Sequence, residues 1–257
     1  MHSGRLLLKW CSDFKMAKKF TNTHCVYCLR FFKKLTSDHV FPKSWYPDTT
    51  PLNLEKWQVP ACSECNSKYS KIESELLQKI GLCLDPTELK SLGIAEKVIR
   101  SLNPENAKTV TDSVHRQKQR EKILKALVPG HKISEEAVFP GFGPPPDMTI
   151  NEQMGFVVPE KQLKVLGEKL VRGITYVKYK RCIDQNYKVF IYTHEENAQL
   201  LVDEIGRSGQ EHHCGPGVHI RAAFVQNDPP RGLFDIEIWG KLRIYSVVLP
   251  REESNNR

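Results

Sequence analysis

The stretch CSECN, from Cys62 to Asn66, repeats the cysteine spacing of CVYC, from Cys25 to Cys28. Each Cys-x-x-Cys is a tight turn that directs two thiolates to one point, and two such turns complete a tetrahedral zinc shell. We therefore predict one structural zinc ion on Cys25, Cys28, Cys62 and Cys65, with no open position for catalysis. This ion would hold together a segment that has too few core residues to fold alone.

The remaining cysteines and the hydropathy of the chain indicate its class. The four cysteines outside the pairs are scattered over 257 residues, whereas disulfide-stapled secreted proteins are usually shorter. No apolar run approaches the roughly 20 residues of a membrane span. The three leucines that precede Lys9 are too few for a secretory signal. We expect a soluble, cytoplasmic protein that does not associate with membranes.

The charge of the chain is uneven. The formal net charge is +8, and residues 1–80 hold 13 Lys and Arg against 7 Asp and Glu. A basic balance favours a polyanionic partner such as nucleic acid, although it also keeps proteins soluble. Lys33, Lys34 and Lys43 are the candidates for phosphate contacts, with solubility alone as the equal alternative.

The segment between the cysteine pairs carries polar residues that a plain zinc ribbon does not need. In order, CVYC, DHVFP from Asp38, NL from Asn53 and CSECN resemble the motifs of the HNH endonuclease family. The resemblance covers residues 23–75, under a quarter of the chain. It implies a zinc-stabilised ββα-metal unit in which a hairpin carries Asp38 and His39 and a helix after Cys65 begins with Asn66.

The same resemblance implies a chemistry. His39 would be the general base on water, since a neutral imidazole accepts a proton near neutral pH. Asp38 and Asn66 would hold one catalytic Mg²⁺ or Mn²⁺ ion, because hard cations take oxygen ligands. Asn53 would orient His39, and double-stranded DNA would be the substrate.

Simpler interpretations stay open for each of these residues. Asp38 and His39 suit an ordinary turn, Asn66 a helix cap, and Asn53 a plain turn. The chain as a whole could be a catalytically inactive, zinc-stabilised nucleic-acid-binding protein. His24 could compete as a zinc ligand, but four cysteines already suffice.

The chain divides into five predicted segments by composition. These are a basic lead-in over 1–22, the HNH unit over 23–81, a helical extension over 82–133, a Pro/Gly-rich linker over 134–150 and an accessory domain over 151–257. Helices are expected over 67–81, from Asp85 and Pro86 to Pro104, and from there to Pro129. We expect the charged stretch RQKQREK, residues 116–122, to be a solvated helix face, with phosphate contact as the alternative.

The last segment predicts a separate α+β domain. An amphipathic helix over 159–174 would bury leucines, TYVKYK (175–180) and YKVFIYT (187–193) would be strands, and a second helix would end near Gly206. Two further strand regions follow, the second with alternating Phe234, Ile236 and Ile238 facing inward. This order favours an antiparallel sheet with helices on one face, so the fold class is α+β.

Two features of this domain carry weak functional signals. His212, His213, Cys214 and His219 suggest a second metal site, but loop histidines are the default interpretation without a fixed spacing. Trp239 is expected in the core rather than stacked on a base. The sequence does not identify a protein partner or ligand of this domain.

Overall fold

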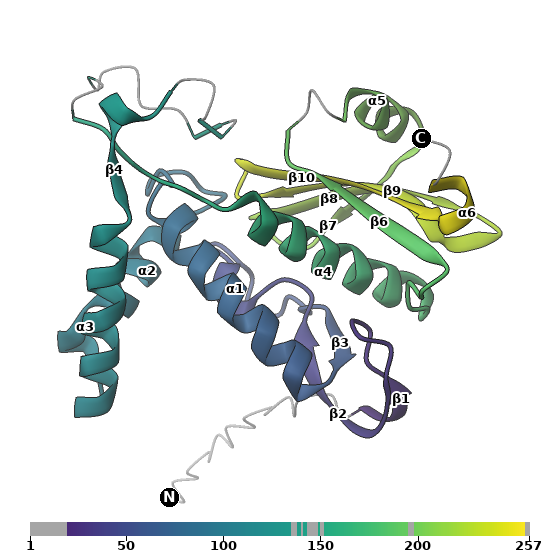
Figure 1. The fold of residues 1–257 in the computed structure, drawn as a ribbon, viewed down its shortest axis with the longest axis horizontal. Coiled ribbons are helices and arrows are strands. Elements are labelled where there is room, and N and C mark those ends of the chain that lie inside the picture. The colour runs from purple at the N-terminus through teal and green to yellow at the C-terminus, as the bar shows by residue number, and fades with distance from the viewer. Residues whose placement is uncertain are drawn as a thin grey trace, which may run out of the picture.

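The structure is a computed structural model, which describes residues 20–134, 138–139, 141–142, 149, 152–194 and 198–254. The predicted lead-in before Phe20, with Cys11, and most of the predicted linker lie outside these residues. The described part is a mixed α+β fold with antiparallel sheets, which confirms the fold class at that level (Figure 1). Within it, no helix combines the length and the apolar character that crossing a membrane requires.

The N-terminal unit is a three-stranded antiparallel sheet followed by a long helix. Its elements are β1 (Phe20–His24), β2 (Phe31–His39), β3 (Gln58–Ala61) and α1 (Ser63–Gly81). The strand order is β1-β2-β3. Helix α1 begins before Cys65, not after it as expected, because Cys62 caps the helix and its sulfur accepts from the backbone N–H of Cys65.

The helical extension contains α2 (Ile94–Leu102) and α3 (Val110–Lys125), with short 3₁₀ turns at Lys43–Trp45 (η1), Pro104–Asn106 (η2) and Gly130–Lys132 (η3). The predicted helix start at Asp85 is wrong. Its carboxylate accepts from both the N–H and the hydroxyl of Thr87, which closes a local turn instead. The first helix of the extension therefore begins only after Gly93.

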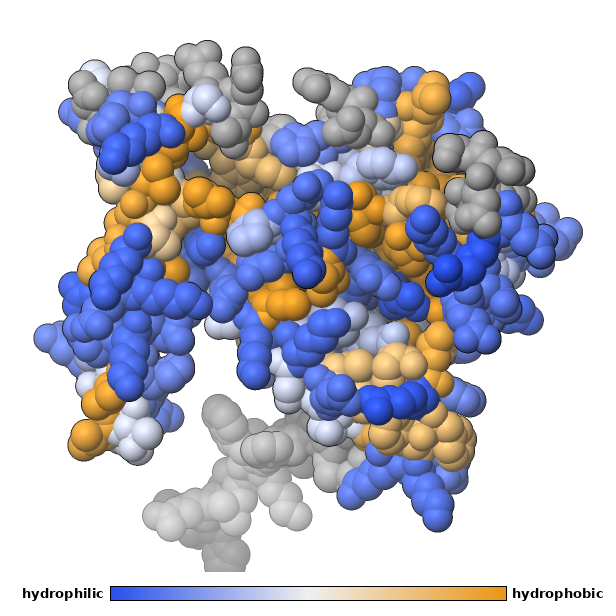
Figure 2. Space-filling view, viewed as in Figure 1, coloured by the Kyte–Doolittle hydropathy of each residue, from blue (hydrophilic) through white to orange (hydrophobic). Residues whose placement is uncertain are grey.

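Helix α3 has a largely solvated surface, as expected for its charged stretch. Its side chains on the face drawn in Figure 2 are mainly hydrophilic, with apolar residues near its two ends. Val110, Val114 and Leu124 are the exposed apolar residues of this helix. The alternative role in phosphate contact stays a prediction.

The C-terminal part is a five-stranded antiparallel sheet with two main helices. Its elements are β6 (Tyr187–Tyr192), β7 (Gln210–His213), β8 (Val218–Val225), β9 (Asp228–Ile238), β10 (Leu242–Pro250), α4 (Glu160–Tyr179), α5 (Gln199–Ser208) and the short α6 (Arg251–Ser254). The strand order is β6-β10-β9-β8-β7. A small pair, β4 (Leu127–Pro129) and β5 (Met154–Phe156), connects the extension to α4. Phe234, Ile236 and Ile238 are fully buried, as their alternation predicted.

Helices α4 and α5 cover opposite faces of this sheet, so the prediction of helices on one face is wrong (Figure 1). Successive residues of β10 point to opposite faces of the sheet, so α4 and α5 contact different residues of this strand. Ile244 lies against Gly167 of α4, whereas Val247 and Leu249 line the cavity beneath α5. A strand that is apolar on both faces can be covered on both sides.

The predicted strand TYVKYK is the last turn and a half of α4. Its aromatic and β-branched residues favour a strand locally, but packing determines the structure here. The segment stays helical because Val171, Ile174 and Thr175 continue the buried face of the helix. The helix ends at Lys180, which adopts left-handed backbone angles.

Helix α4 packs against both the N-terminal unit and the sheet of the C-terminal part. At Gly167 an added Cβ would lie 2.9 Å from methyl carbons of Ile191 and Ile244 in the sheet. At Gly173 it would lie 2.8 Å from both methyl carbons of Val40, directly after β2. Both glycines thus allow close approach, on two sides of one helix. The domain boundaries stay predictions, but one buried cluster extends across them from Cys25 to Val248.

Trp239 packs against the N-terminal unit, and its full burial confirms the prediction that it lies in the core. Its ring centroid lies 4.8 Å from that of Trp45, and its Nε1–H donates to the Trp45 carbonyl at 2.7 Å. We expect Trp239→Ala to lower the free energy of unfolding by about 3–5 kcal/mol, because it leaves a large buried cavity. Urea denaturation measures this loss.

The matched control is Trp239→Phe, which keeps most of the apolar area but leaves the Trp45 carbonyl without its donor. Its cost should be smaller, about 1–3 kcal/mol. An alanine variant that loses less than about 1 kcal/mol, as surface substitutions do, would contradict this role.

Candidate functional site

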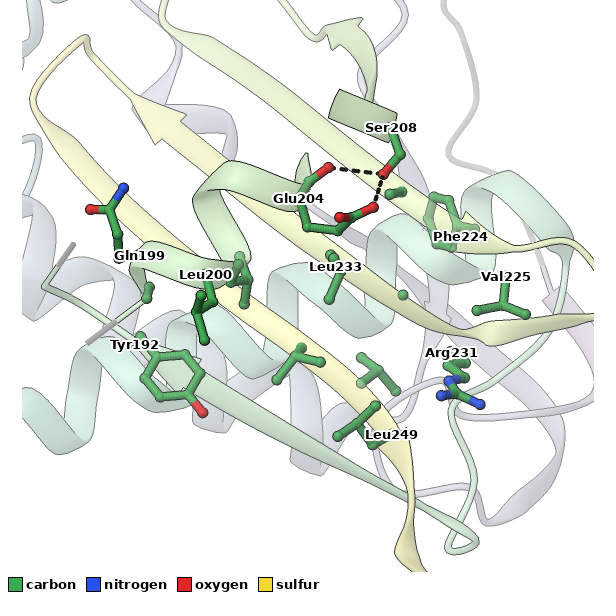
Figure 3. A pocket seen from close by; sticks show the side chains of 16 residues that line it. Tyr192, Gln199, Leu200, Glu204, Ser208, Phe224, Val225, Arg231, Leu233 and Leu249 are labelled. Carbon is green, nitrogen blue, oxygen red and sulfur yellow. Dashed lines mark hydrogen bonds between the residues drawn. The ribbon is translucent and has the colours of Figure 1, made fainter. Parts of the chain in front are cut away.

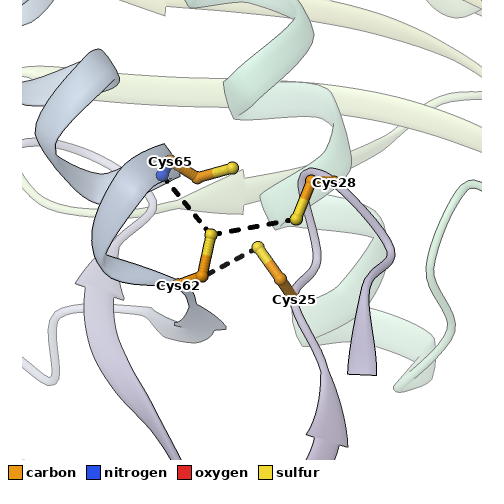
Figure 4. Close-up of side chains that lie close together, drawn as sticks. All are labelled: Cys25, Cys28, Cys62 and Cys65. Atoms are coloured by element: carbon orange, nitrogen blue, oxygen red, sulfur yellow. Dashed lines mark hydrogen bonds between the residues drawn. The ribbon is translucent and has the colours of Figure 1, made fainter. Parts of the chain in front are cut away.

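The four paired cysteines meet at one point, at the base of α1 (Figure 4). All four sulfur atoms lie within 4.8 Å of one another, and those of Cys28 and Cys62 are 3.8 Å apart. Zn–S bonds of about 2.3 Å give a tetrahedron whose edges are about 3.8 Å. Cys25, Cys28, Cys62 and Cys65 could therefore hold a zinc ion, with two ligands from the turn after β1 and two from the start of α1.

Donors around this cluster favour the thiolate form of Cys28, whereas burial raises the pKa of Cys25 and of Cys65. The backbone N–H of Cys62 donates to the sulfur of Cys25 at 3.4 Å, and Arg30 Nε lies 3.5 Å from the sulfur of Cys28. Although burial raises it, the Arg30 guanidinium lowers the pKa of Cys28 to about 6. A thiolate is the form that binds metal, so the arrangement suits the predicted structural ion.

Asp38 and His39 end β2 and differ in their surroundings. Asp38 is 8% exposed, and its Oδ2 accepts from the Tyr27 hydroxyl at 2.7 Å and lies 3.1 Å from Lys169 Nζ. His39 is half-buried, and its Nε2 lies 3.1 Å from Nε2 of Gln58. The carboxylate thus faces the interior, whereas the imidazole stays within reach of solvent.

The charges around His39 favour its neutral form. Burial lowers the pKa of the imidazole below its usual value near 6.5, and Asp38 opposes this shift. The positive charges of Lys169, Lys43 and Lys56 lower the pKa further. At neutral pH the ring is therefore uncharged and lies beside lysine cations.

Gln58 contacts the imidazole, and the sequence pattern did not point to it; the orienting role of Asn53 stays a prediction. Gln58 is paired with His39 in the register between β2 and β3, and its Oε1 accepts from the Ser37 hydroxyl at 2.8 Å. Asn53 lies in an exposed turn, and no hydrogen bond joins it to His39 among the described residues. To predict this contact from the sequence, one would need the register between β2 and β3, which an 18-residue connection separates.

Asn66 lies in the first turns of α1 and is partly exposed. Its Nδ2 is 3.4 Å from the Thr36 hydroxyl, on the same face of β2 as Asp38 but two residues earlier. Two residues of a strand span about 7 Å. The structure thus places Asn66 near Asp38 on one face without bringing the two side chains into contact.

The positions of Asp38 and Asn66 do not suit a divalent cation. Mg²⁺ binds oxygen at about 2.0–2.1 Å, so two ligand oxygens would lie within about 4 Å of each other. The Asp38 oxygen instead contacts the ammonium of Lys169, which repels a dication, and Asn66 points to Thr36. Asp38 and Asn66 do not fit Mg²⁺ or Mn²⁺ as they stand, and their predicted role as its ligands is not shown.

The histidines of the C-terminal part form no comparable centre. His212 and His213 lie in β7, not in a loop as expected, and His213 is paired in register with His219 of β8. Cys214 is buried, which raises the pKa of its thiol to about 12. Among the described side chains, the only group of three or more potential metal ligands is the set of four paired cysteines.

A cavity of about 850 Å³ lies between α5 and the adjacent face of the sheet (Figure 3). Its lining is mainly apolar, and its polar groups include Glu204 and Ser208, which hydrogen bond to each other. The cavity is on the opposite side of the sheet from α4. It is therefore separate from Asp38 and His39.

Comparisons with known proteins add no identity to these observations. No family model, no curated protein and no solved structure matches this chain.

Proposed function

We propose that this chain is an endonuclease that hydrolyses phosphodiester bonds in double-stranded DNA, with His39 as the general base. The observation that carries the proposal is a half-buried imidazole at the end of β2, whose pKa is lowered first by burial and then by Lys169, Lys43 and Lys56. A base must be uncharged to accept a proton, and a phosphodiester is an anion that lysines attract. Both requirements are met at the same place.

The hydrogen bond to Gln58 determines which ring nitrogen acts. A carboxamide presents either its oxygen or its nitrogen to Nε2. In the structure the Gln58 Oε1 accepts from the Ser37 hydroxyl and the amide nitrogen faces Nε2. The mechanism requires the reversed amide, in which Oε1 accepts from Nε2–H and the amide donates to the Ser37 hydroxyl. Nδ1 then carries the lone pair. In this state His39 takes a proton from water at Nδ1 while the water oxygen attacks phosphorus and the leaving oxygen takes a proton from solvent.

The surrounding cations would stabilise the charge that develops on the phosphoryl oxygens. Lys43 is exposed in the turn after β2, and Lys56 Nζ lies 5.1 Å from the ring centroid of Tyr46. The zinc ion has a structural role here, since a closed four-thiolate shell leaves no position for water. The likeness of residues 23–75 to HNH endonucleases supports the same chemistry.

The direct test is the conversion of supercoiled plasmid to nicked or linear DNA by the zinc-loaded protein. It is run without added cation and with Mg²⁺ or Mn²⁺, and each arm includes His39→Ala. Cleavage by wild type that the variant lacks supports the proposal. Absence of cleavage in every arm contradicts it.

A second function is favoured by the surroundings of Asp38. Because its carboxylate is engaged by Tyr27 and Lys169, Asp38 is not free to bind a catalytic metal. The chain would then be a catalytically inactive, zinc-stabilised nucleic-acid-binding protein. In that case wild type and His39→Ala bind DNA equally and neither cleaves it.

A further inference from the structure

Lys169 of α4 has a fully buried side chain that reaches into the N-terminal unit. Its Nζ donates to the His39 carbonyl at 2.7 Å, contacts Asp38 Oδ2 at 3.1 Å and bonds to Glu73 Oε1 of α1. An ammonium has three N–H donors, and three oxygen atoms, one each from His39, Asp38 and Glu73, lie around this one. The group is therefore fully satisfied although water does not reach it.

The charges at this position also need a cation. The side chains of Asp38 and Glu73 are only 10% and 12% exposed. Removing one partner of a buried ion pair leaves an uncompensated charge, which is strongly destabilising. Lys169 is the one cation that contacts both carboxylates among the described residues.

We propose that Lys169 is a built-in cation of this site, held between Asp38 and Glu73 in the place that a divalent metal ion would otherwise take. The wild-type protein then excludes Mg²⁺ and Mn²⁺ from Asp38. Its ammonium also positions His39 through the backbone carbonyl. The site is complete only when α4 lies against β2 and α1, which makes the C-terminal part of the chain a component of it.

The exclusion of metal is independent of catalysis, whereas the positioning of a base rests on the proposed function. The two therefore fail separately. A wild-type protein that cleaves no DNA counts against the function alone. An Asp38-dependent metal site in wild type counts against Lys169 alone.

The experiment is a Mn²⁺ titration of the zinc-loaded full chain, followed by electron paramagnetic resonance of the free ion. Wild type should show no site that depends on Asp38. Lys169→Met keeps the volume of the stem but removes the charge, so Asp38 and Glu73 become available to a dication. It should bind Mn²⁺ at least about tenfold more tightly than wild type does, because a nearby positive charge is gone. Adding Asp38→Asn should abolish that gain.

The matched control is Lys164→Met on the same helix. The Lys164 side chain is 49% exposed and pairs with Glu160 one turn away, so its loss should leave Mn²⁺ binding as in wild type. Thermal denaturation gives a second readout: Mg²⁺ should raise the melting temperature of Lys169→Met and leave that of wild type unchanged. A purely structural lysine would give a loss of stability without either metal response.

The result that overturns the proposal is a Mn²⁺ site in wild type that Asp38→Asn removes, or equal Mn²⁺ affinity in wild type and a folded Lys169→Met. If Lys169→Met does not fold, the comparison of wild type with Asp38→Asn still decides. Binding that differs between these two contradicts a built-in cation, and equal, weak binding supports it.

Discussion

Cys62→Ser is expected to abolish zinc binding and to unfold the N-terminal unit. Structural zinc sites contribute on the order of 10–16 kcal/mol of apparent binding free energy in small peptides. The segment between β1 and α1 has more core residues than the sequence indicated, Val40, Phe41 and Trp45 among them, but the ion would tie the turn after β1 to the start of α1. Serine is a good helix cap, so the variant keeps the cap on α1 while it loses the sulfur ligand. The effect can therefore be assigned to the metal and not to the helix start.

Zinc content by mass spectrometry and hydrogen exchange resolved along the sequence measure the two parts of this prediction. Exchange should increase over residues 23–80, near Gly173 of α4, which contacts Val40, and around Trp239, which packs on Trp45. The rest of the sheet of β6 to β10 should keep its protection. Cys83→Ser, outside the cluster, is the control and should retain one zinc ion per chain. Well-folded wild-type protein without zinc would contradict the prediction.

The sequence predicted features that depend on local chemistry. Each Cys-x-x-Cys is a single turn, so the convergence of the four sulfurs required only that two turns meet. The alternation of Phe234, Ile236 and Ile238 predicted which face of β9 is buried, because a strand alternates its faces with a period of two. The capping geometry at Cys62 is a local feature too, but the expectation of a later helix start missed it.

Other features depend on contacts between distant segments, and the sequence did not give them. Lys169 is 131 residues from Asp38, and a lysine on a helix is normally read as solvated. One signal was available: Lys169 follows Leu163 and Leu166 at intervals of three, on the buried stripe of the helix. A charge on such a stripe needs a partner, but only the packing of α4 on β2 shows which one.

The register between β2 and β3 and the face of the sheet that each helix covers could not be predicted from the sequence either. Gln58 contacts His39 because β2 and β3 pair in one register, and a slip by one residue would turn Gln58 to the other face. The two helices of the C-terminal part cover both faces of the sheet because β10 is apolar on both. That pattern is visible in RIYSVVL, residues 243–249, but the position of α5 is not.

His39→Ala is expected to reduce DNA cleavage by about 10²–10⁴-fold, the usual contribution of a general base. DNA affinity should stay close to that of wild type, because the imidazole acts on water and the lysines bind phosphate. Single-turnover nicking of plasmid and fluorescence anisotropy with a labelled duplex measure the two quantities. His115→Ala, on the solvated helix α3, is the matched control and should cleave normally.

The pH dependence tests the same role, with a sign that follows from burial. The active form of the base is neutral, and burial lowers the pKa of His39 below 6.5. Cleavage by wild type should therefore be nearly constant from about pH 7 to 8 and fall only below pH 6.5, as the ring becomes protonated. The residual activity of His39→Ala should lack this acid limb. Equal cleavage by wild type and His39→Ala, or an acid limb that survives in the variant, would show that another group accepts the proton.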